Sequence, residues 1–227
     1  HVKQKEQIYR RRFLPTLSRF NTTANLWTAE ALWEGSVSRE QYAEITALIG
    51  SKRGFDTLVE APWASLALSN EKSNGVIPFH WEFAYPEVFL SAERNSNGGF
   101  DVILGNPPYD VLSEREIGHD IEYLAHFISL DSTLQPSLKG KNNLYKLFIC
   151  RSLELLAPGG HMSFIVPMAM LGDEQASELR RTLLSEGEFS VVHAFPQKDI
   201  PTRRVFRDAK LSTALFAYHK LGTGEIS

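Results

Sequence analysis

The stretch Phe100–Gly105 reads Phe-Asp-Val-Ile-Leu-Gly, and the predicted fold starts from it. The run is short, mostly apolar and ended by a glycine, which is typical of a buried strand in a parallel sheet. The preceding residues 95–99 have the composition of a loop, and a long polar connection follows the strand. We therefore expect an α/β region to begin at Phe100.

The pattern after this strand alternates between helix and strand. A helix is predicted over residues 143–156, where Leu144, Leu147, Phe148 and Leu153 recur at helical spacing before Pro158-Gly159-Gly160. A second helix is predicted over residues 174–185. Strands are predicted at residues 161–166, 189–195 and 212–219. This order is typical of an open α/β sheet with crossover connections.

The N-terminal part has a different, helical pattern. Apolar residues between Ile8 and Phe20 predict a first helix, and residues 22–33 a second. A third is predicted from Ser38, as N-cap, to Ile49. Residues 51–99 are mixed and broken by Gly, Asn, Ser and Pro. We expect a helical segment at residues 1–75 and an α/β domain at residues 76–227.

Composition limits the classes of protein to which the chain can belong. With 227 residues and 43% hydrophobic residues, it can form one domain with a small appendage. The net charge of -3 gives no overall basic field for nucleic acid, although a local basic patch would suffice. Cys150 is the single cysteine, so the sequence excludes a disulfide within the chain, and we expect no metal site. With neither a signal peptide nor a transmembrane run in the sequence, we expect an intracellular protein.

A turn whose residues could take part in a reaction follows the strand directly. It reads Asn106-Pro107-Pro108-Tyr109. Ligands of open α/β sheets bind beyond the carboxyl ends of strands, where this turn is expected. The two prolines have fixed φ angles and no N–H groups, so the turn offers carbonyl acceptors on a stiff support. Asn106 adds a side-chain carbonyl and Tyr109 adds a flat ring. Taken alone, the same string also fits ordinary turn chemistry.

These groups fit the binding of a planar exocyclic amine. Two acceptors that take both N–H bonds would draw the nitrogen toward tetrahedral geometry and stabilise the positive charge that develops on it. Its lone pair could then attack an electrophilic methyl group held in line. A base inside a duplex cannot reach such a turn, so it would have to be flipped out and stacked on an aromatic ring.

Four blocks of sequence resemble the gamma-type adenine-N6 DNA methyltransferases, in particular the methylase core of type IIG restriction–modification and related phage-defence enzymes. The blocks are Phe79–Phe89, Phe100–Tyr109, Asn143–Ile149 with Leu156–Pro167, and Val205-Phe206 with Leu211–Ala217. The resemblance implies the second half of a Rossmann-like, S-adenosylmethionine-dependent methyltransferase sheet. It also implies a cytoplasmic, prokaryotic enzyme that acts on double-stranded DNA.

The resemblance assigns roles to individual residues. The amine would donate one hydrogen bond to the side chain of Asn106 and one to the backbone carbonyl of Pro107. Pro108 belongs to the same catalytic motif. Tyr109 would stack on one face of the flipped adenine and Phe206 on the other, although Phe206 also fits a core position. The neighbouring cations either grip DNA phosphate or form a solvated loop; they are Arg203, Arg204, Arg207 and Lys210.

One feature of that family is missing from this sequence. Its glycine-rich cofactor turn has no counterpart before Asn106, and the chain does not begin with Met. We therefore expect part of a longer polypeptide, without its cofactor half and target-recognition domain. Two alternatives remain open at this point: a methyltransferase of protein glutamine or RNA, and a catalytically inert fragment.

Overall fold

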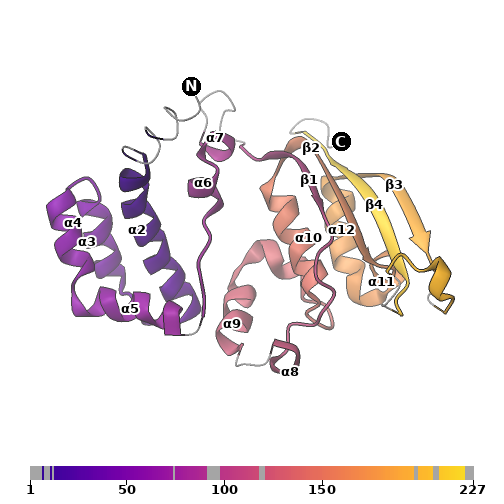
Figure 1. The fold of residues 1–227 in the computed structure, drawn as a ribbon, viewed down its shortest axis with the longest axis horizontal. Helices are drawn as coiled ribbons and strands as arrows, with labels where there is room; N and C mark the ends of the chain where they lie inside the picture. The colour runs from indigo at the N-terminus through magenta and orange to yellow at the C-terminus, as the bar shows by residue number, and fades with distance from the viewer. Residues whose placement is uncertain are drawn as a thin grey trace. The chain divides into compact units, whose positions relative to one another are not determined.

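A computed structural model describes residues 7, 11, 13–73, 75–90, 98–117, 121–196, 199–206 and 210–222 (Figure 1). It divides into two compact units, His1–Leu90 and Ser91–Ser227. The sequence puts the domain boundary at residue 75, whereas residues 76–90 group with the helical unit in the structure. How the protein divides into domains in solution stays a prediction.

The first unit is helical, with a core of its own. Leu26, Ile45, Phe55 and Ala64 are among the side chains buried in it. At the start of its second helix, Ser38 forms the expected cap, accepting from Gln41 N while the Gln41 side chain accepts from Ser38 N. The unit contains α2 (Leu14–Leu32), α3 (Arg39–Leu48), α4 (Lys52–Val59), α5 (Pro62–Ser73), α6 (Trp81–Ala84) and α7 (Pro86–Phe89).

The structure corrects the helix pattern expected here in two places. Residues 14–32 form one helix instead of two, because the hydroxyls of Thr22 and Thr23 donate to carbonyls four residues back and so fit inside the helix. Helices α4 and α5 occupy a stretch expected to be mixed. In α4, the Ser51 side chain accepts from Gly54 N as an N-cap, and Phe55 is buried. The helix was not predicted because a glycine in its first turn is typical of a loop.

The second unit is built on a four-stranded sheet, which confirms the α/β fold class. The strands are β1 (Phe100–Gly105), β2 (Leu156–Pro167), β3 (Gly187–Phe195) and β4 (Thr213–Lys220), in the order β1-β2-β4-β3. β1 and β2 are parallel, but β4 is antiparallel to both of its neighbours. The sheet is therefore mixed, since the chain between β3 and β4 turns back without a crossover helix.

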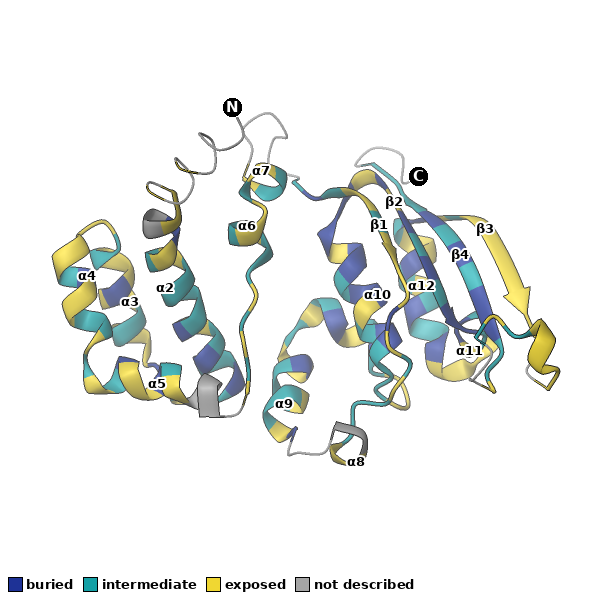
Figure 2. Ribbon diagram, in the orientation of Figure 1, coloured by how far each residue is buried: buried dark blue, intermediate teal, exposed yellow. Residues whose placement is uncertain are grey.

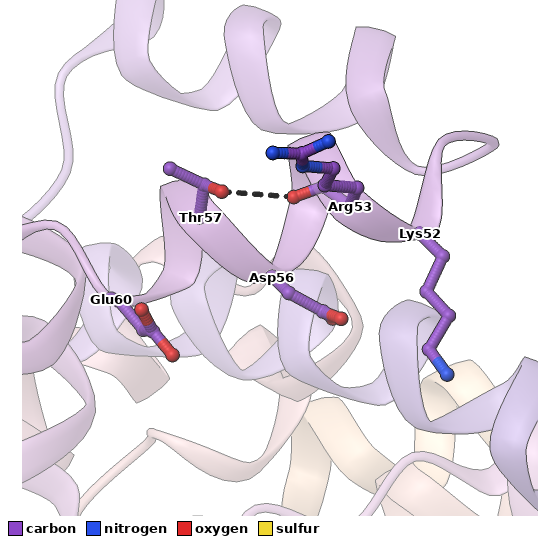
Figure 3. Close-up of a pocket in the computed structure, with 5 residues that line it drawn as sticks. All are labelled: Lys52, Arg53, Asp56, Thr57 and Glu60. Atoms are coloured by element: carbon purple, nitrogen blue, oxygen red, sulfur yellow. Dashed lines mark hydrogen bonds between the residues drawn. The ribbon is translucent and has the colours of Figure 1, made fainter.

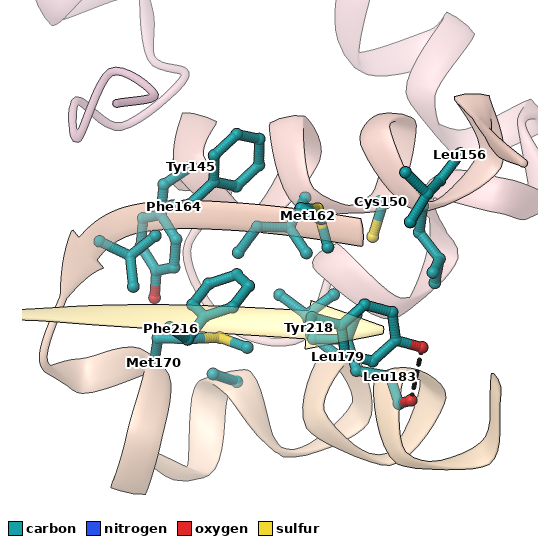
Figure 4. Close-up of a cluster of buried hydrophobic side chains, with 14 of the residues drawn as sticks. Tyr145, Cys150, Leu156, Met162, Phe164, Met170, Leu179, Leu183, Phe216 and Tyr218 are labelled. Carbon is teal, nitrogen blue, oxygen red and sulfur yellow. Dashed lines mark hydrogen bonds between the residues drawn. The ribbon is translucent and has the colours of Figure 1, made fainter. Parts of the chain in front are cut away.

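Helices connect these strands and cover one face of the sheet. α10 and α12 pack against Met162 and Phe164 of β2 and Phe216 and Tyr218 of β4 (Figure 4). Tyr218 is fully buried, and its hydroxyl donates to Leu183 O at 2.8 Å. The connecting elements are α8 (Glu114–Ile117), α9 (Glu122–Leu130), η3 (Ser132–Ser137), α10 (Leu144–Leu155), α11 (Ala169–Gly172), η4 (Glu174–Ala176), α12 (Ser177–Glu186) and η5 (Pro201–Arg203).

Burial in this unit differs from the sequence-based expectation in two elements (Figure 2). β1 is not buried: Val102 is 56% and Leu104 is 73% exposed, because they lie on the sheet face opposite to the one that packs on the helices, whereas Ile103 packs on the core. In α10, Phe148 is 48% exposed, while Tyr145 and Lys146 are buried. Among the helices that the structure describes, none is both long and apolar enough to cross a bilayer.

Candidate active site

The Asn-Pro-Pro-Tyr turn lies where the sequence predicts it, directly after β1 and at the carboxyl ends of the parallel strands β1 and β2. The strand before it packs closely on β2, with Gly105 opposite Phe164. A Cβ atom on Gly105 would lie 2.7 Å from the Phe164 ring, so the glycine permits this approach. The turn therefore starts from a tightly packed strand end.

Exposure differs along the turn. Asn106 and Pro108 are exposed, Pro107 is buried, and Tyr109 is half-buried against the core of the sheet unit. The side chain that we expect to bind the amine is thus accessible to solvent, on a support that is partly packed. The residue that anchors this support to the core is Tyr109.

The Tyr109 hydroxyl connects the turn to β2. It lies 3.0 Å from Asn106 Oδ1 and 3.1 Å from Ile165 O. Both partners are acceptors, so the single hydroxyl proton can be donated to only one of them at a time. Burial raises the pKa of Tyr109, which keeps this proton in place at neutral pH. The contact of the hydroxyl with Ile165 O was not expected from the sequence.

The structure brings Phe206 to the same place. The rings of Tyr109 and Phe206 meet edge to face, with centroids 6.2 Å apart and planes inclined at 70°. Phe206 is half-buried and comes from the segment after η5, far from Tyr109 in the sequence. Two aromatic rings thus lie in contact at the turn, one of them bonded through its hydroxyl to the exposed Asn106 amide, and their roles in stacking on a base stay a prediction.

The cations near Phe206 have different surroundings. Arg203 is exposed at the end of η5, and Arg204 is half-buried. Lys210 forms a surface ion pair with Asp199, with Nζ 3.2 Å from Oδ1. Arg207 lies outside the described residues. Their proposed contact with DNA phosphate stays a prediction.

A short backbone ladder holds the chain just beyond the turn, and sequence reasoning missed it. Leu112 N donates to Asn142 O at 2.8 Å, and Leu144 N donates to Asp110 O at 2.9 Å. Val111 and Asn143 form the antiparallel bridge between these two bonds. Polar residues directly before an apolar helix were the available signal. The turn is therefore fixed on both sides, by β1 and by the start of α10.

Other candidate residues fall outside this site. His80 lies in the helical unit, where its ring is hydrogen-bonded to Asn25 at 2.8 Å. Cys150 is buried in α10, and burial raises the pKa of its thiol to about 12. A surface hollow lies on α4 of the helical unit, where Thr57 Oγ1 donates to Arg53 O (Figure 3). Its lining contains none of the residues of the turn.

Comparison with known proteins assigns the family. The model of the Eco57I restriction-modification methylases matches residues 4–200. The chain belongs to this family. Among relatives of this Eco57I-family chain, the type II methyltransferase M.TthHB8I of Thermus thermophilus is 35% identical over 125 residues, covering 55% of the chain and 27% of the relative. The type II methyltransferase M.HincII of Haemophilus influenzae is 24% identical over 172 residues, covering 73% and 30%.

The Eco57I-family chain therefore spans less than a third of the length of these relatives. Among solved structures, a class I S-adenosylmethionine-dependent methyltransferase of Listeria monocytogenes is 17% identical at a TM-score of 0.40, covering 56% of this chain and 33% of the other. This structural likeness is weak. The curated relatives named here are both type II methyltransferases.

Proposed function

We propose that this chain is the base-binding part of a site-specific DNA methyltransferase that transfers a methyl group from S-adenosylmethionine to N6 of a flipped adenine. Such an enzyme would belong to a restriction–modification or phage-defence system. The observation that carries the proposal is the exposed Asn106 amide at the end of β1, which is hydrogen-bonded to Tyr109, whose ring in turn contacts Phe206. Membership of a restriction-modification methylase family supports it.

The residues of this chain fit the acceptor base. Asn106 Oδ1 has two lone pairs, and the Tyr109 hydroxyl can use only one of them. The other would accept an N–H bond of the adenine amine, while the Pro107 carbonyl would accept the second. The two hydrogen bonds strengthen as positive charge develops on nitrogen during methyl transfer, so they lower the barrier.

S-adenosylmethionine would supply the electrophilic methyl group, whereas the residues of this chain would bind and orient the adenine amine. The groups gathered here are an amide, a phenol hydroxyl and two rings. They fit a planar base, whereas we assign no cofactor contact to this chain. The residues proposed for catalysis are accordingly Asn106, Pro107, Pro108 and Tyr109, with Phe206 as the second ring.

Substitution of Asn106 tests the proposal in the whole protein. Asn106→Ala removes the amide acceptor, and we expect kcat for adenine methylation to fall by about 10²- to 10³-fold, as for the loss of one transition-state hydrogen bond. Asn106→Asp keeps acceptor oxygens and should retain more activity than the alanine variant. The measurement is transfer of a labelled methyl group to duplex DNA, with circular dichroism to verify the fold.

The same assay separates the alternative functions. RNA and glutamine-containing peptides are offered in place of DNA, and methyl transfer to either but not to DNA would replace the present proposal. Full activity of a correctly folded Asn106→Ala protein would exclude the amide as the group that binds the amine. An inactive wild-type protein would support the inert alternative.

A further inference from the structure

Lys146 is a buried cation that has no role in the proposed reaction. Its side chain lies in the first turn of α10 and is completely buried. Burial lowers the pKa of Lys146, an effect that Cys150 and Asp173 partly oppose. Within the described part of the chain, it forms no ion pair with a carboxylate. A buried amine without a counter-ion is costly, so its hydrogen bonds should have a structural purpose.

The ammonium group donates to two backbone carbonyls from separate elements. Nζ lies 2.8 Å from Lys139 O and 3.4 Å from Gln175 O. Lys139 belongs to the loop of residues 139–143 between η3 and α10, and Gln175 belongs to η4. Lys146 therefore ties this loop both to its own helix and to η4.

The Gln175 side chain ties the same loop a second time. Lys141 N donates to Gln175 Oε1 at 3.2 Å. Gly140 has a φ of 75°, and a Cβ atom there would lie 2.6 Å from the Gln175 side chain. Only a residue without a side chain fits such a close approach in the left-handed region. Residues 139–143 are thus held in one conformation from two sides.

This loop is also the partner of the catalytic turn. Its last residues, Asn142 and Asn143, pair with residues 111 and 112, which follow Tyr109 closely. Hydrogen bonds at both ends of residues 139–143, joined by the backbone of this loop, thus connect Lys146 and Gln175 to the segment just after the turn. We name this connection, from Lys146 Nζ to Leu112 N, the brace.

We propose that Lys146 is a positioning residue for Asn106, which acts by holding the brace that fixes the chain after the Asn-Pro-Pro-Tyr turn. The inference rests on the proposed methyl transfer at Asn106. A group that stabilises a transition state must be held to within about 0.5 Å of its productive position. β1 fixes the chain before Asn106, and the brace fixes it after Tyr109. Because Lys146 is completely buried, it acts on the reaction through the position of Asn106 and not by direct contact with DNA.

The test replaces Lys146 by methionine, which keeps the apolar stem but has no N–H donors. In the whole protein, Lys146→Met should lower kcat for adenine methylation about tenfold, because small misplacements at a reacting centre are costly. The KM for DNA should change less than about twofold, because the lost interaction acts in the transition state. A residue needed only for folding would lower the folded fraction instead and leave kcat per folded molecule unchanged.

Gln175→Ala gives an independent test if the methionine variant does not fold. It removes the acceptor of Lys141 N but leaves Gln175 O and α10 intact, so kcat should fall by about threefold, the effect of one hydrogen bond. The matched control is Arg181→Ala. It removes an exposed ion pair with Glu178 within α12 and keeps every hydrogen bond of the brace, so kcat should not change.

The outcomes divide clearly. A lower kcat in the folded Lys146→Met or Gln175→Ala protein, with an unchanged Arg181→Ala control, supports the inference. Wild-type kcat in the folded Gln175→Ala protein, and in Lys146→Met where that folds, overturns it, as does an equal fall in the control. Asn106→Ala is measured in parallel. If that protein remains active, the proposed function fails; if it is inactive while the brace variants are normal, only the inference fails.

Discussion

Tyr109 contributes two separable groups to the site, a ring and a hydroxyl. The ring lies beside Phe206, and the hydroxyl contacts Asn106 and Ile165. Tyr109→Phe keeps the ring, so capture of the flipped base should be largely preserved, with a loss of stability of about 1 kcal/mol for the hydrogen bond. Tyr109→Ala removes the ring and should weaken capture by about 1–3 kcal/mol.

Fluorescence of 2-aminopurine at the target position measures base capture, and denaturant unfolding measures stability. Tyr109→Trp, which also has a flat face, serves as the control for stacking. If the phenylalanine variant loses capture as completely as the alanine variant, then the hydroxyl rather than the ring holds the base.

Prediction from sequence succeeded best for residues whose chemistry is local. Asn106 and Tyr109 are three positions apart in a stiff turn, so the sequence alone predicts that they lie together, and the structure confirms this. Phe206 required the family resemblance, because its proximity depends on the path of the chain after β3. Lys146 was missed, because a lysine in an amphipathic helix is expected on its solvated face. Its burial depends on carbonyls from two distant segments.

At the scale of elements, periodicity predicted the strands well and their surroundings poorly. The predicted strand at residues 212–219 corresponds to β4, but its antiparallel place between β2 and β3 leaves no mark in the local pattern. α10 ends at Leu155, close to the predicted end, but β2 begins at Leu156 instead of residue 161, and Pro158-Gly159-Gly160 lie in an irregular part of β2, where Gly159 has a φ of 79°. Apolar runs predict strands from composition alone, but burial depends on which neighbours cover them.

Two arginines in the segment after β3 lead to a prediction about the salt dependence of DNA binding. Arg203 is exposed at the end of η5, next to the segment that carries Phe206. If Arg203 and Arg204 contact phosphate, replacing each by alanine should reduce the slope of log K against log salt by about 1. Arg181→Ala is the charge-matched control, because Arg181 is exposed on α12 and paired with Glu178 at 2.7 Å. A slope that changes equally in all three variants would argue against a specific phosphate contact.

At the scale of the whole molecule, the two units should respond separately to the loss of a core side chain. Each has its own buried cluster, and Leu26 is completely buried in that of the helical unit. Leu26→Ala should lower the stability of that unit by about 2–5 kcal/mol, the usual cost of a large cavity. Amide hydrogen exchange should then speed up in α2–α5 and remain unchanged in the sheet.

The exchange of residues 79–90 in the same variant locates the domain boundary, because His80 is bonded to Asn25 of α2. Faster exchange there would place the boundary near residue 90, whereas exchange that stays with the sheet would place it at residue 75. A uniform loss of protection throughout the chain would show a single cooperative domain instead.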